Sequence, residues 1–556
     1  MLRSRWLGRV PYREALELQR ALFTHGRDNH LLLLEHPHVY TLGVRADPAN
    51  VLVPPASVGA DLVRTDRGGD VTYHGPGQLV GYPILSLPGK RGVADGMADT
   101  VAYVRSVEQL LIDVLADVGL PSAGRLRDFP GVWIDPLGPR PRKIAAIGVK
   151  LSRGRTMHGF ALNVATDLSM FDHIVPCGIV GNTVTSMHAE GIDVSMETVV
   201  EKGVARAAAV WGQGESDHAA VAWRHRPDDL SPFSRGDGPG EPVRLRGRLA
   251  AAGVADGLSI STRKPDWLRA KATMGPEYMR LKSTVRELDL VTVCEDAGCP
   301  NIFECWADGT ATFMILGERC TRACGFCLVD TSKPLPADEH EPERVAEAVA
   351  RLRLSHAVVT MVARDDLPDG GAAAVAATVA AIRRRNPSTA VEVLISDLKG
   401  DLDALDVVLA ARPDVLNHNV ETVPRLQRAV RPSAGYARSL AVLAHAVAAG
   451  LTVKSGLVVG MGETDDEIES TLADLAGVGV SIVTIGQYLR PTTNHLPVAR
   501  WVEPDQFTRF AEVGHAMGIG HVESSPLTRS SYHARQAAAA GVVAATAGAG
   551  KAGAID

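Results

Sequence analysis

Apolar residues recur with two different periods along this chain, and the period predicts which segments are strands and which are helices. Short apolar runs, typical of buried strands, occur at residues 312–316, 357–362, 390–395, 415–417, 451–456 and 481–485. Between them lie stretches with the period of helices, at 342–353, 372–384, 402–411, 438–449 and 464–475. Strands that alternate with helices predict a parallel, barrel-like sheet. Its chemistry is expected at the carboxyl ends of the strands.

The chain before residue 212 contains both patterns and predicts a separate α/β domain at 1–211. Residues 30–35 and 144–149 are typical of strands. Apolar residues between 101 and 118 share one face of a predicted helix, and Gly119 is expected to end that helix. Residues 212–258 lose this periodicity and are rich in turn-forming residues, which predicts a flexible linker. A second domain is expected at 259–536, followed by a low-complexity tail of Ala, Gly and Val at 537–556.

Length and composition agree with a two-domain globular protein. The 556 residues exceed what one hydrophobic core usually holds. A formal net charge of −6, with mixed signs, gives no sign of nucleic-acid binding. The first residues lack the apolar stretch of a signal peptide, and the apolar run at 31–34 is too short to cross a membrane. We therefore expect a cytoplasmic protein with neither nucleic-acid nor membrane partners.

The cysteines are few and clustered. Six of the seven lie between Cys294 and Cys327, and in a reducing compartment such clustering indicates metal binding rather than disulfides. Cys320, Cys324 and Cys327 follow directly after the first predicted barrel strand. Three thiolates on one short loop can hold three irons of a four-iron cluster and leave the fourth iron open for substrate. A zinc knuckle is the alternative, but structural zinc needs four ligands, usually from two paired motifs.

This loop, Cys-Thr-Arg-Ala-Cys-Gly-Phe-Cys, resembles the signature of radical S-adenosylmethionine (SAM) enzymes. The resemblance implies a partial (β/α)6 barrel and a [4Fe–4S] cluster whose open iron binds SAM. It further implies that an electron from the cluster cleaves SAM to a 5′-deoxyadenosyl radical. A partner such as ferredoxin or flavodoxin would supply that electron.

A second cysteine group, Cys294, Cys299 and Cys305, resembles the auxiliary-cluster motif of lipoyl synthase. Further short motifs that resemble this family occur over about residues 262–535. The resemblance implies a second [4Fe–4S] cluster, with Ser531 as its fourth ligand. This cluster would give up sulfur to C6 and C8 of a protein-bound octanoyl chain, and two SAM molecules would be used per product. The chain departs from the family pattern at the single positions Ala363, Ser396 and Leu398, which concern packing or substrate contacts rather than the reaction class.

The seventh cysteine, Cys177, lies in an apolar Pro-Cys-Gly word, where a lone cysteine is more often buried packing than a nucleophile. Its companions are a glycine-rich polar stretch at 67–78, Lys143 before a predicted strand, and His158 before Gly159. Glycine lets the backbone approach a ligand closely. Together these motifs resemble the lipoyl(octanoyl) transferase family over about residues 12–207. The implied fold is the α/β domain shared with biotin and lipoate ligases.

This second resemblance implies that Cys177 accepts an octanoyl group from acyl carrier protein and passes it to a lysine of a lipoyl domain. The receiving domains would be those of 2-oxoacid dehydrogenase complexes and the glycine cleavage H protein. Lys143 would favour the Cys177 thiolate, because a nearby ammonium lowers a thiol pKa, and it could take the proton of the attacking amine. The residues that match the family's substrate-binding stretches are Arg67, Gly68, Gly69, Asp70, Val71, Thr72, Tyr73, His74, Ala146, Ile147, Gly148, Gly159, Phe160 and Ala161.

Several alternatives stay open at this point. An ATP-using lipoate or biotin ligase has the same fold but needs no nucleophilic cysteine, and a zinc-organised scaffold could bind acylated proteins without chemistry. His74 and His158 are polar groups of the site or satisfied core histidines. Four arginines around the Lys143 strand form either a basic rim for an acidic carrier protein or an ordinary solvated face; they are Arg140, Arg142, Arg153 and Arg155.

Overall fold

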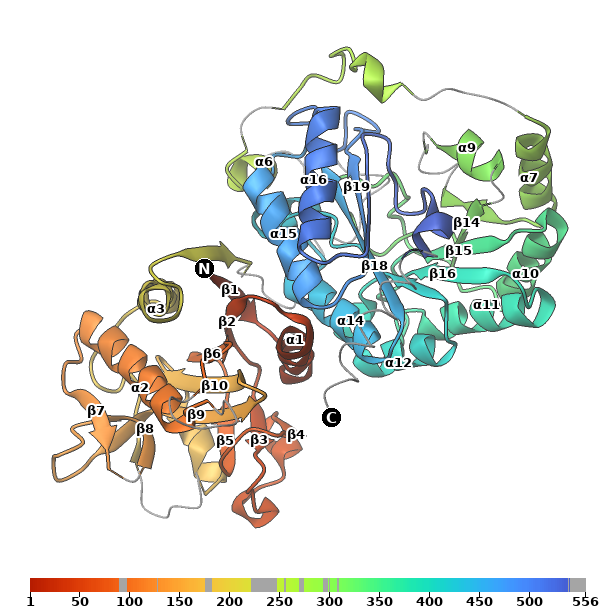
Figure 1. Ribbon diagram of the computed structural model, residues 1–556. Coiled ribbons are helices and arrows are strands. Elements are labelled where there is room, and N and C mark those ends of the chain that lie inside the picture. Colours follow the sequence, from red (N-terminus) through yellow and green to blue (C-terminus); the bar gives the residue numbers. More distant parts are fainter. Residues whose placement is uncertain are drawn as a thin grey trace. The chain divides into compact units, whose positions relative to one another are not determined.

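The computed structural model describes residues 1–89, 98–127, 129–175, 183–221, 248–254, 257–269, 275–293, 299, 301–307, 310–538 and 540. The chain forms two compact units that divide between Trp223 and Arg224 (Figure 1). None of the described helices is long and apolar enough to cross a bilayer. Each unit is an α/β structure, as the sequence predicts.

The N-terminal unit is built on a mixed sheet with the strand order β12-β1-β2-β6-β10-β9-β8-β7, and β11 pairs with β9. Its strands are β1 (Leu2–Arg9), β2 (Asn29–Glu35), β6 (Gln78–Ile84), β7 (Ala123–Leu126), β8 (Phe129–Ile134), β9 (Arg142–Ser152), β10 (Arg155–Asn163), β11 (Thr183–Val184) and β12 (Ser216–Ala220). A smaller sheet has the order β4-β3-β5. Its strands are β3 (Val39–Leu42), β4 (Asp61–Arg64) and β5 (Val71–His74).

Helices cover both faces of the larger sheet (Figure 1). Helices α2 (Thr100–Asp117) and α3 (Met196–Trp211) bury their apolar residues with the strands in one core, and α1 (Tyr12–His25) packs on the opposite face against Met157 of β10. The side chain of Asp99 accepts a hydrogen bond from the amide of Ala102 at the start of α2. Gly119 follows the end of α2 with a φ of 100°, a conformation that favours glycine, so the predicted end of this helix is confirmed.

The C-terminal unit contains the predicted parallel sheet. Six strands match the six predicted apolar runs: β14 (Thr310–Ile315), β15 (His356–Met361), β16 (Ala390–Leu394), β17 (Val415–Asn417), β18 (Thr452–Val459) and β19 (Ile482–Gln487). They pair in chain order, each parallel to the next. Two short edge strands were not predicted, the antiparallel β13 (Val291–Thr292) and the parallel β20 (His521–Ser524). Both are too short to show a period in the sequence.

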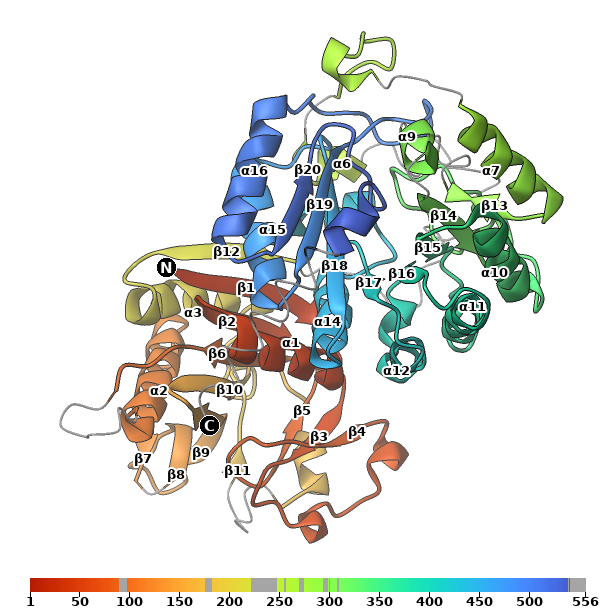
Figure 2. The same ribbon diagram turned by 45° about the vertical axis from the view of Figure 1, so that its right-hand side comes forward.

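The sheet curves as a partial barrel, and a row of helices covers its outer face (Figure 2). The five predicted helices are α10 (Glu341–Leu352), α11 (Ala372–Arg385), α12 (Leu402–Ala410), α14 (Tyr436–Ala448) and α15 (Asp465–Gly477). Two further described helices of this unit are α7 (Pro276–Glu287), which precedes β13, and α16 (Pro504–Ala516), which precedes β20. This arrangement leaves the loops after the strands at one end of the sheet, where the cysteine loop begins.

The predicted linker boundaries need correction at both ends. Strand β12 lies after residue 211 and pairs with β1, so the first domain continues past its predicted end. The short helix α6 (Arg248–Ala251) begins before residue 258, and Leu258 donates its amide hydrogen to the carbonyl of Val498 at 2.6 Å. Most of the predicted linker, at 222–247, and most of the predicted tail, at 541–556, lie outside the described residues.

Gly203 in α3 is buried, yet a Cβ atom built there would meet no other atom within 4 Å. We predict that Gly203→Ala stabilises the N-terminal unit by about 1 kcal/mol, because alanine is the better helix former and fills empty space. Native-state hydrogen exchange of α3 amides in the full chain should show about fivefold stronger protection. Gly212→Ala is the matched control, since its Cβ would lie 2.3 Å from the Glu215 carbonyl oxygen and should destabilise the same unit. Unchanged protection in Gly203→Ala would contradict the prediction.

Candidate functional site

The predicted substrate-binding stretches of the N-terminal unit meet in one pocket. Its lining contains Arg67–Thr72 and His74, Ala146–Gly148, Gly159–Ala161 and Lys143, together with Tyr12, Tyr82 and His158. Tyr73 is the one predicted residue that does not line it. The ring of Tyr73 packs against Tyr40 and Phe171 in a separate apolar cluster, so its assignment as a substrate-binding residue is not supported.

Close backbone contacts between glycines shape this pocket. The amide of Gly68 donates to the Val149 carbonyl of β9 at 3.0 Å, and a Cβ on Gly148 would lie 3.0 Å from the Gly68 carbonyl oxygen. A Cβ on Gly159 would lie 2.1 Å from the Gly81 carbonyl oxygen. A larger residue at these positions would push the strands or the loop apart. The absence of side chains on Gly68 and Gly148 thus lets the loop at 67–70 lie against β9, and Gly159 lets β10 pair closely with β6.

Lys143 has a defined place beside an aromatic ring. Its Nζ lies 5.3 Å from the centroid of the Trp133 ring, close enough for a cation–π contact. Gly131 has a φ of 121°, and a Cβ there would lie 2.8 Å from the Lys143 Cε. The side chain of Lys143 thus lies in a space that Gly131 leaves open.

The candidate nucleophile Cys177 lies outside the described residues, but both flanks of its segment are fixed. On one side, the amide of Val175 donates to the Asn50 carbonyl at 2.8 Å. On the other side, Val184 of β11 lies opposite Lys143 in the parallel register of β11 and β9. Cys177 precedes β11 by six residues in the sequence. The strand that follows Cys177 in the sequence therefore lies next to Lys143.

Two histidines of the pocket are buried and hydrogen-bonded. Nδ1 of His74 lies 2.8 Å from Oε1 of Gln78, and Nε2 of His158 lies 2.8 Å from Oδ1 of Asp66. Burial lowers the pKa of His74 well below its usual value and that of His158 to about 4. Burial opposes ionisation of Asp66, but hydrogen bonds from Lys150 and His158 lower its pKa to about 2. Both histidines are neutral at neutral pH and part of the pocket lining, but the buried Nδ1 of His158 has no hydrogen-bond partner among the described residues.

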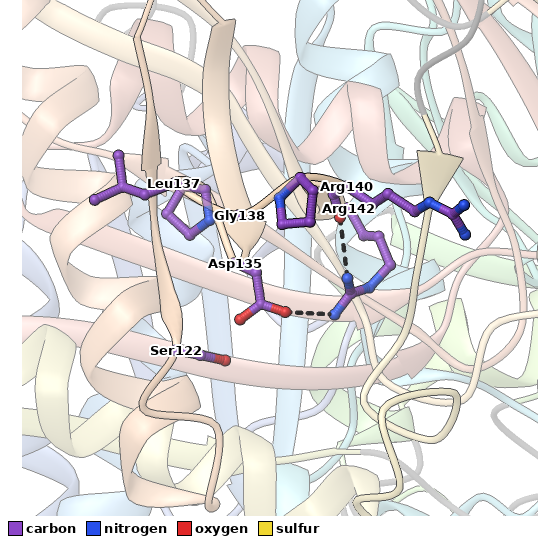
Figure 3. A pocket seen from close by; sticks show the side chains of 8 residues that line it. Ser122, Asp135, Leu137, Gly138, Arg140 and Arg142 are labelled. Carbon is purple, nitrogen blue, oxygen red and sulfur yellow. Dashed lines mark hydrogen bonds and ion pairs between the residues drawn. The ribbon is translucent and has the colours of Figure 1, made fainter.

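The four arginines do not form one basic rim. Arg142 binds Glu190 and Asp135 through its guanidinium at 2.7 and 2.9 Å, and Figure 3 shows it turned toward Asp135 beside a surface hollow. Arg155 donates to the Ser86 hydroxyl and the Asp28 carbonyl. Arg142 begins β9, whereas Arg153 and Arg155 come after its last residue. The eleven residues of this strand span roughly 35 Å. The single-rim hypothesis is therefore wrong, because strand length separates its two halves.

In the C-terminal unit, the loop of Cys320, Cys324 and Cys327 leaves the carboxyl end of β14, as predicted. Its backbone is held by the short helix α13 (Gln427–Val430) and by the loop that contains His495. The amide of Gly325 donates to the Val430 carbonyl at 2.8 Å, and a ring nitrogen of His495 lies 2.9 Å from the Cys327 carbonyl oxygen. The loop is thus attached to segments distant in sequence.

A buried arginine also fastens this loop, and the sequence analysis did not single it out. The Arg322 guanidinium donates to both carboxylate oxygens of Asp365 at 2.7 and 2.8 Å and to Asp397 at 2.6 Å. Burial disfavours the charge of Arg322, but the two carboxylates raise its pKa well above the ordinary value. Asp397 lies between Ser396 and Leu398, two positions that depart from the family pattern, and Leu398 adopts a φ of 45°. Only the spatial meeting of three loops reveals this network.

The chemistry of the three thiols fits an iron–sulfur cluster. Burial raises the pKa of Cys324 to about 11 and also raises the pKa values of Cys320 and Cys327. A buried thiol becomes a thiolate readily when a metal supplies positive charge. Among the described residues, no three His, Cys, Asp or Glu side chains are close enough to hold a single metal ion. A four-iron cluster does not require such convergence, since each thiolate binds a different iron.

The second cysteine group lies beside the C-terminal Arg-Ser-Ser-Tyr word. Cys299 and Cys305 are described, the latter on α9 (Ile302–Ala307), whereas Cys294 lies outside the described residues. Tyr532 donates to the Glu304 carboxylate at 3.2 Å. Burial raises the pKa of Cys299, and the positive charge of Arg529 partly offsets this effect. Residues more than 200 positions apart are thereby brought together, including two of the three predicted auxiliary ligands.

Comparisons with known proteins agree with both halves of this description. The family model of the lipoyl protein ligase A/B catalytic domain matches residues 11–207, that of the radical SAM superfamily matches 314–475, and that of the N-terminal domain of lipoyl synthase matches 253–299. The lipoyl synthase of Rubrobacter xylanophilus is 58% identical over 275 residues, 49% of this chain and 86% of the relative. That of Mycobacterium avium is 56% identical over 282 residues, 50% and 92% of the two chains.

Solved structures resemble each half only distantly. A putative lipoate protein ligase from T. acidophilum with bound lipoic acid is 19% identical, covers 40% of this chain and 90% of its own, and has a TM-score of 0.32. Methylornithine synthase is 12% identical, covers 46% and 80%, and has a TM-score of 0.31. These scores are too low to support a functional comparison.

The parallel barrel and its cysteine loop define the C-terminal unit as a radical SAM domain, and the N-terminal unit is a lipoyl protein ligase A/B catalytic domain. Through its C-terminal half, the chain belongs to the lipoyl synthase family. That family implies SAM and [4Fe–4S] clusters as cofactors, which the buried thiols of the cysteine loop fit.

The buried histidines of the N-terminal unit predict an acid-sensitive fold. Burial lowers the pKa values of His36 and His158 to about 4, against 6.5 for an exposed histidine. Below pH 6.5 the unfolded chain binds more protons than the folded one, so stability present above pH 6.5 should be lost as pH falls towards 4. Each histidine contributes up to about 1.4 kcal/mol per pH unit. His36→Gln should flatten this dependence, as measured by urea unfolding at pH 7, 6 and 5; an unchanged slope would refute the assignment.

Proposed function

We propose that this chain carries out two successive steps of protein lipoylation. The N-terminal domain transfers an octanoyl group from acyl carrier protein to a lysine of a lipoyl domain. The C-terminal domain then inserts sulfur at C6 and C8 of the protein-bound octanoyl group. The observation that carries the proposal is the pairing of a lipoyl synthase barrel, with its buried cysteine loop, and a ligase A/B pocket on one chain.

Cys320, Cys324 and Cys327 would hold the radical-generating cluster, whose fourth iron binds SAM. When bound, this cluster and SAM supply the radical that removes hydrogen from C6 and C8. The protein's own part is to keep the loop in place. Arg322 does so through Asp365 and Asp397, and the contact between His495 and the Cys327 carbonyl fixes the end of the loop.

Cys294, Cys299, Cys305 and Ser531 would hold a second, auxiliary cluster, which supplies the sulfur when bound. An oxygen ligand is unusual for cluster iron, because a hydroxyl or alkoxide is harder than a thiolate. One unlike ligand makes a cluster asymmetric, which suits a group that must release sulfide. The contacts that Asn301, which precedes α9, and Glu304 of α9 make with residues 527–532 support this ligand set, since they bring the two segments together.

In the N-terminal domain, Cys177 would accept the octanoyl group as a thioester and pass it to the lysine amine. As an ammonium, Lys143 would stabilise the Cys177 thiolate and give a proton to the departing thiolate of the acyl carrier protein. As a neutral amine, it would then take the proton of the attacking lysine amine. The pocket between the loop at 67–70, β9 and β10 would hold the acyl chain. The cation–π contact with Trp133 supports this role, because it keeps the ammonium at the pocket beside the strand that follows Cys177.

The proposed reactions define the partners. Acyl carrier protein is the octanoyl donor, lipoyl domains of 2-oxoacid dehydrogenase complexes and the H protein are the acceptors, and a ferredoxin or flavodoxin in the cytoplasm supplies electrons. The octanoyl intermediate is carried on a lipoyl domain and can diffuse between sites. A tether between the two domains would then act mainly through effective concentration.

Cys177→Ser should abolish the octanoyl–enzyme adduct and octanoyl transfer, while sulfur insertion into an octanoylated lipoyl domain stays normal. Lys143→Ala should slow acylation by at least tenfold, because loss of the ammonium disfavours the thiolate. Mass spectrometry of the chain after incubation with octanoyl-acyl carrier protein, with and without ATP, measures both effects. Lys150→Ala is a control with another lysine of β9 that contacts Asp66 instead. An ATP-dependent reaction without an adduct would indicate a ligase.

Cys294→Ala should lower the iron content by about four atoms per chain and end lipoyl formation, yet spare SAM cleavage. Ser531→Cys should keep both clusters but impair sulfur insertion, because a fourth thiolate removes the asymmetry. Iron and sulfide analysis of anaerobically reconstituted protein, combined with mass analysis of the lipoyl domain after one turnover, tests both variants. If Cys294→Ala still produced lipoyl groups, the sacrificial-cluster assignment would have to be abandoned.

A further inference from the structure

Both serines of the Arg-Ser-Ser-Tyr word are hydrogen-bonded to the barrel. The hydroxyl of Thr312, in the middle of β14, donates to the Ser531 hydroxyl oxygen at 2.9 Å. The side-chain amide of Asn419, just after β17, donates to the Ser530 hydroxyl oxygen at 2.7 Å. These two bonds attach the adjacent serines to β14 and to the segment that follows β17. Each serine oxygen therefore has its own fixed donor.

Other contacts hold this segment independently of Thr312. The Asn301 side chain donates to the Leu527 carbonyl at 2.6 Å, and the Thr528 carbonyl lies so close to Gly486 that a Cβ there would come within 2.0 Å of it. Tyr532 binds Glu304 on α9. With contacts on both sides of Ser531, the Thr312 hydroxyl is not needed to hold the segment in place. Its specific effect is on one oxygen.

Thr312 suits the orientation of a single oxygen. Its side chain is 2% exposed, and β-branching in a strand restricts its rotamer, so the hydroxyl direction is fixed. A hydroxyl oxygen has two lone pairs, and the Thr312 hydrogen occupies one of them. The other lone pair of the Ser531 oxygen is then directed away from β14.

We propose that Thr312 is a positioning residue that orients the Ser531 oxygen as a ligand of the auxiliary cluster. The proposal rests on the proposed function, in which Ser531 is that ligand. Thr312 thus presents the Ser531 oxygen in one orientation, and loss of that orientation should loosen the hold of the oxygen on iron.

The test measures iron retention rather than activity. Thr312→Val removes the hydroxyl but keeps the shape, and Thr312→Ser keeps the hydroxyl. In anaerobically reconstituted full-length protein without SAM, Thr312→Val should lose auxiliary-cluster iron to a chelator about fivefold faster, the effect expected for loss of one hydrogen bond. Its Mössbauer spectrum should show a changed signal for one iron of the auxiliary cluster. Thr312→Ser should resemble the unaltered chain in both measurements.

Thr310→Val is the matched control, because Thr310 is a buried threonine two residues earlier on the same strand. It should leave iron release and the spectrum unchanged. Normal iron retention in Thr312→Val, or equally fast loss in Thr312→Ser and Thr310→Val, would overturn the proposal, the latter because packing rather than hydrogen bonding would be responsible. Ser531→Ala tests the proposed ligand set separately from the role of Thr312. If it too retained iron normally, Ser531 would not be a ligand and the proposed ligand set itself would fail.

Discussion

The position of the cysteine loop depends on one buried guanidinium. Arg322 lies within the loop, and its two carboxylate partners, Asp365 and Asp397, follow β15 and β16. A charge removed from water is stable only when it is paired, and breaking such a pair costs about 3–5 kcal/mol. The loop therefore cannot move away from the barrel without leaving a buried charge. Three loops that are separate in sequence are joined at the end of the sheet where the thiols lie.

In the N-terminal domain, the comparable constraint is the approach of one backbone to another. The loop at 67–70 lies against β9 because Gly68 and Gly148 have no side chains to keep them apart. Polar groups then surround a pocket whose shape comes mainly from the backbone. Buried neutral histidines line it, and their burial lowers their pKa values. The pocket is thus apolar in character although many of its residues are polar.

The two domains use cysteine in different ways under the proposed function. Burial alone would keep Cys320, Cys324 and Cys327 protonated, and iron provides the charge that makes them thiolates. Cys177 would instead rely on an organic cation, Lys143, whose ammonium is placed by Trp133 and Gly131. A thiolate that reacts with an acyl group must stay free of metal, so separate domains suit the two kinds of chemistry.

The sequence by itself determined the six parallel strands, the helices between them and both cysteine spacings, because these depend on local periodicity and on short loops. It also indicated the stretches that line the pocket of the N-terminal domain, through glycine-rich motifs that resemble the lipoyl(octanoyl) transferase family. Tertiary structure alone decided that Tyr73 turns away from the pocket and that Arg142 and Arg155 lie at opposite ends of β9. It also decided that Arg322 meets Asp397, and that Thr312 meets Ser531 across 219 positions. A sequence period records which face of an element is buried, but not which distant element covers that face.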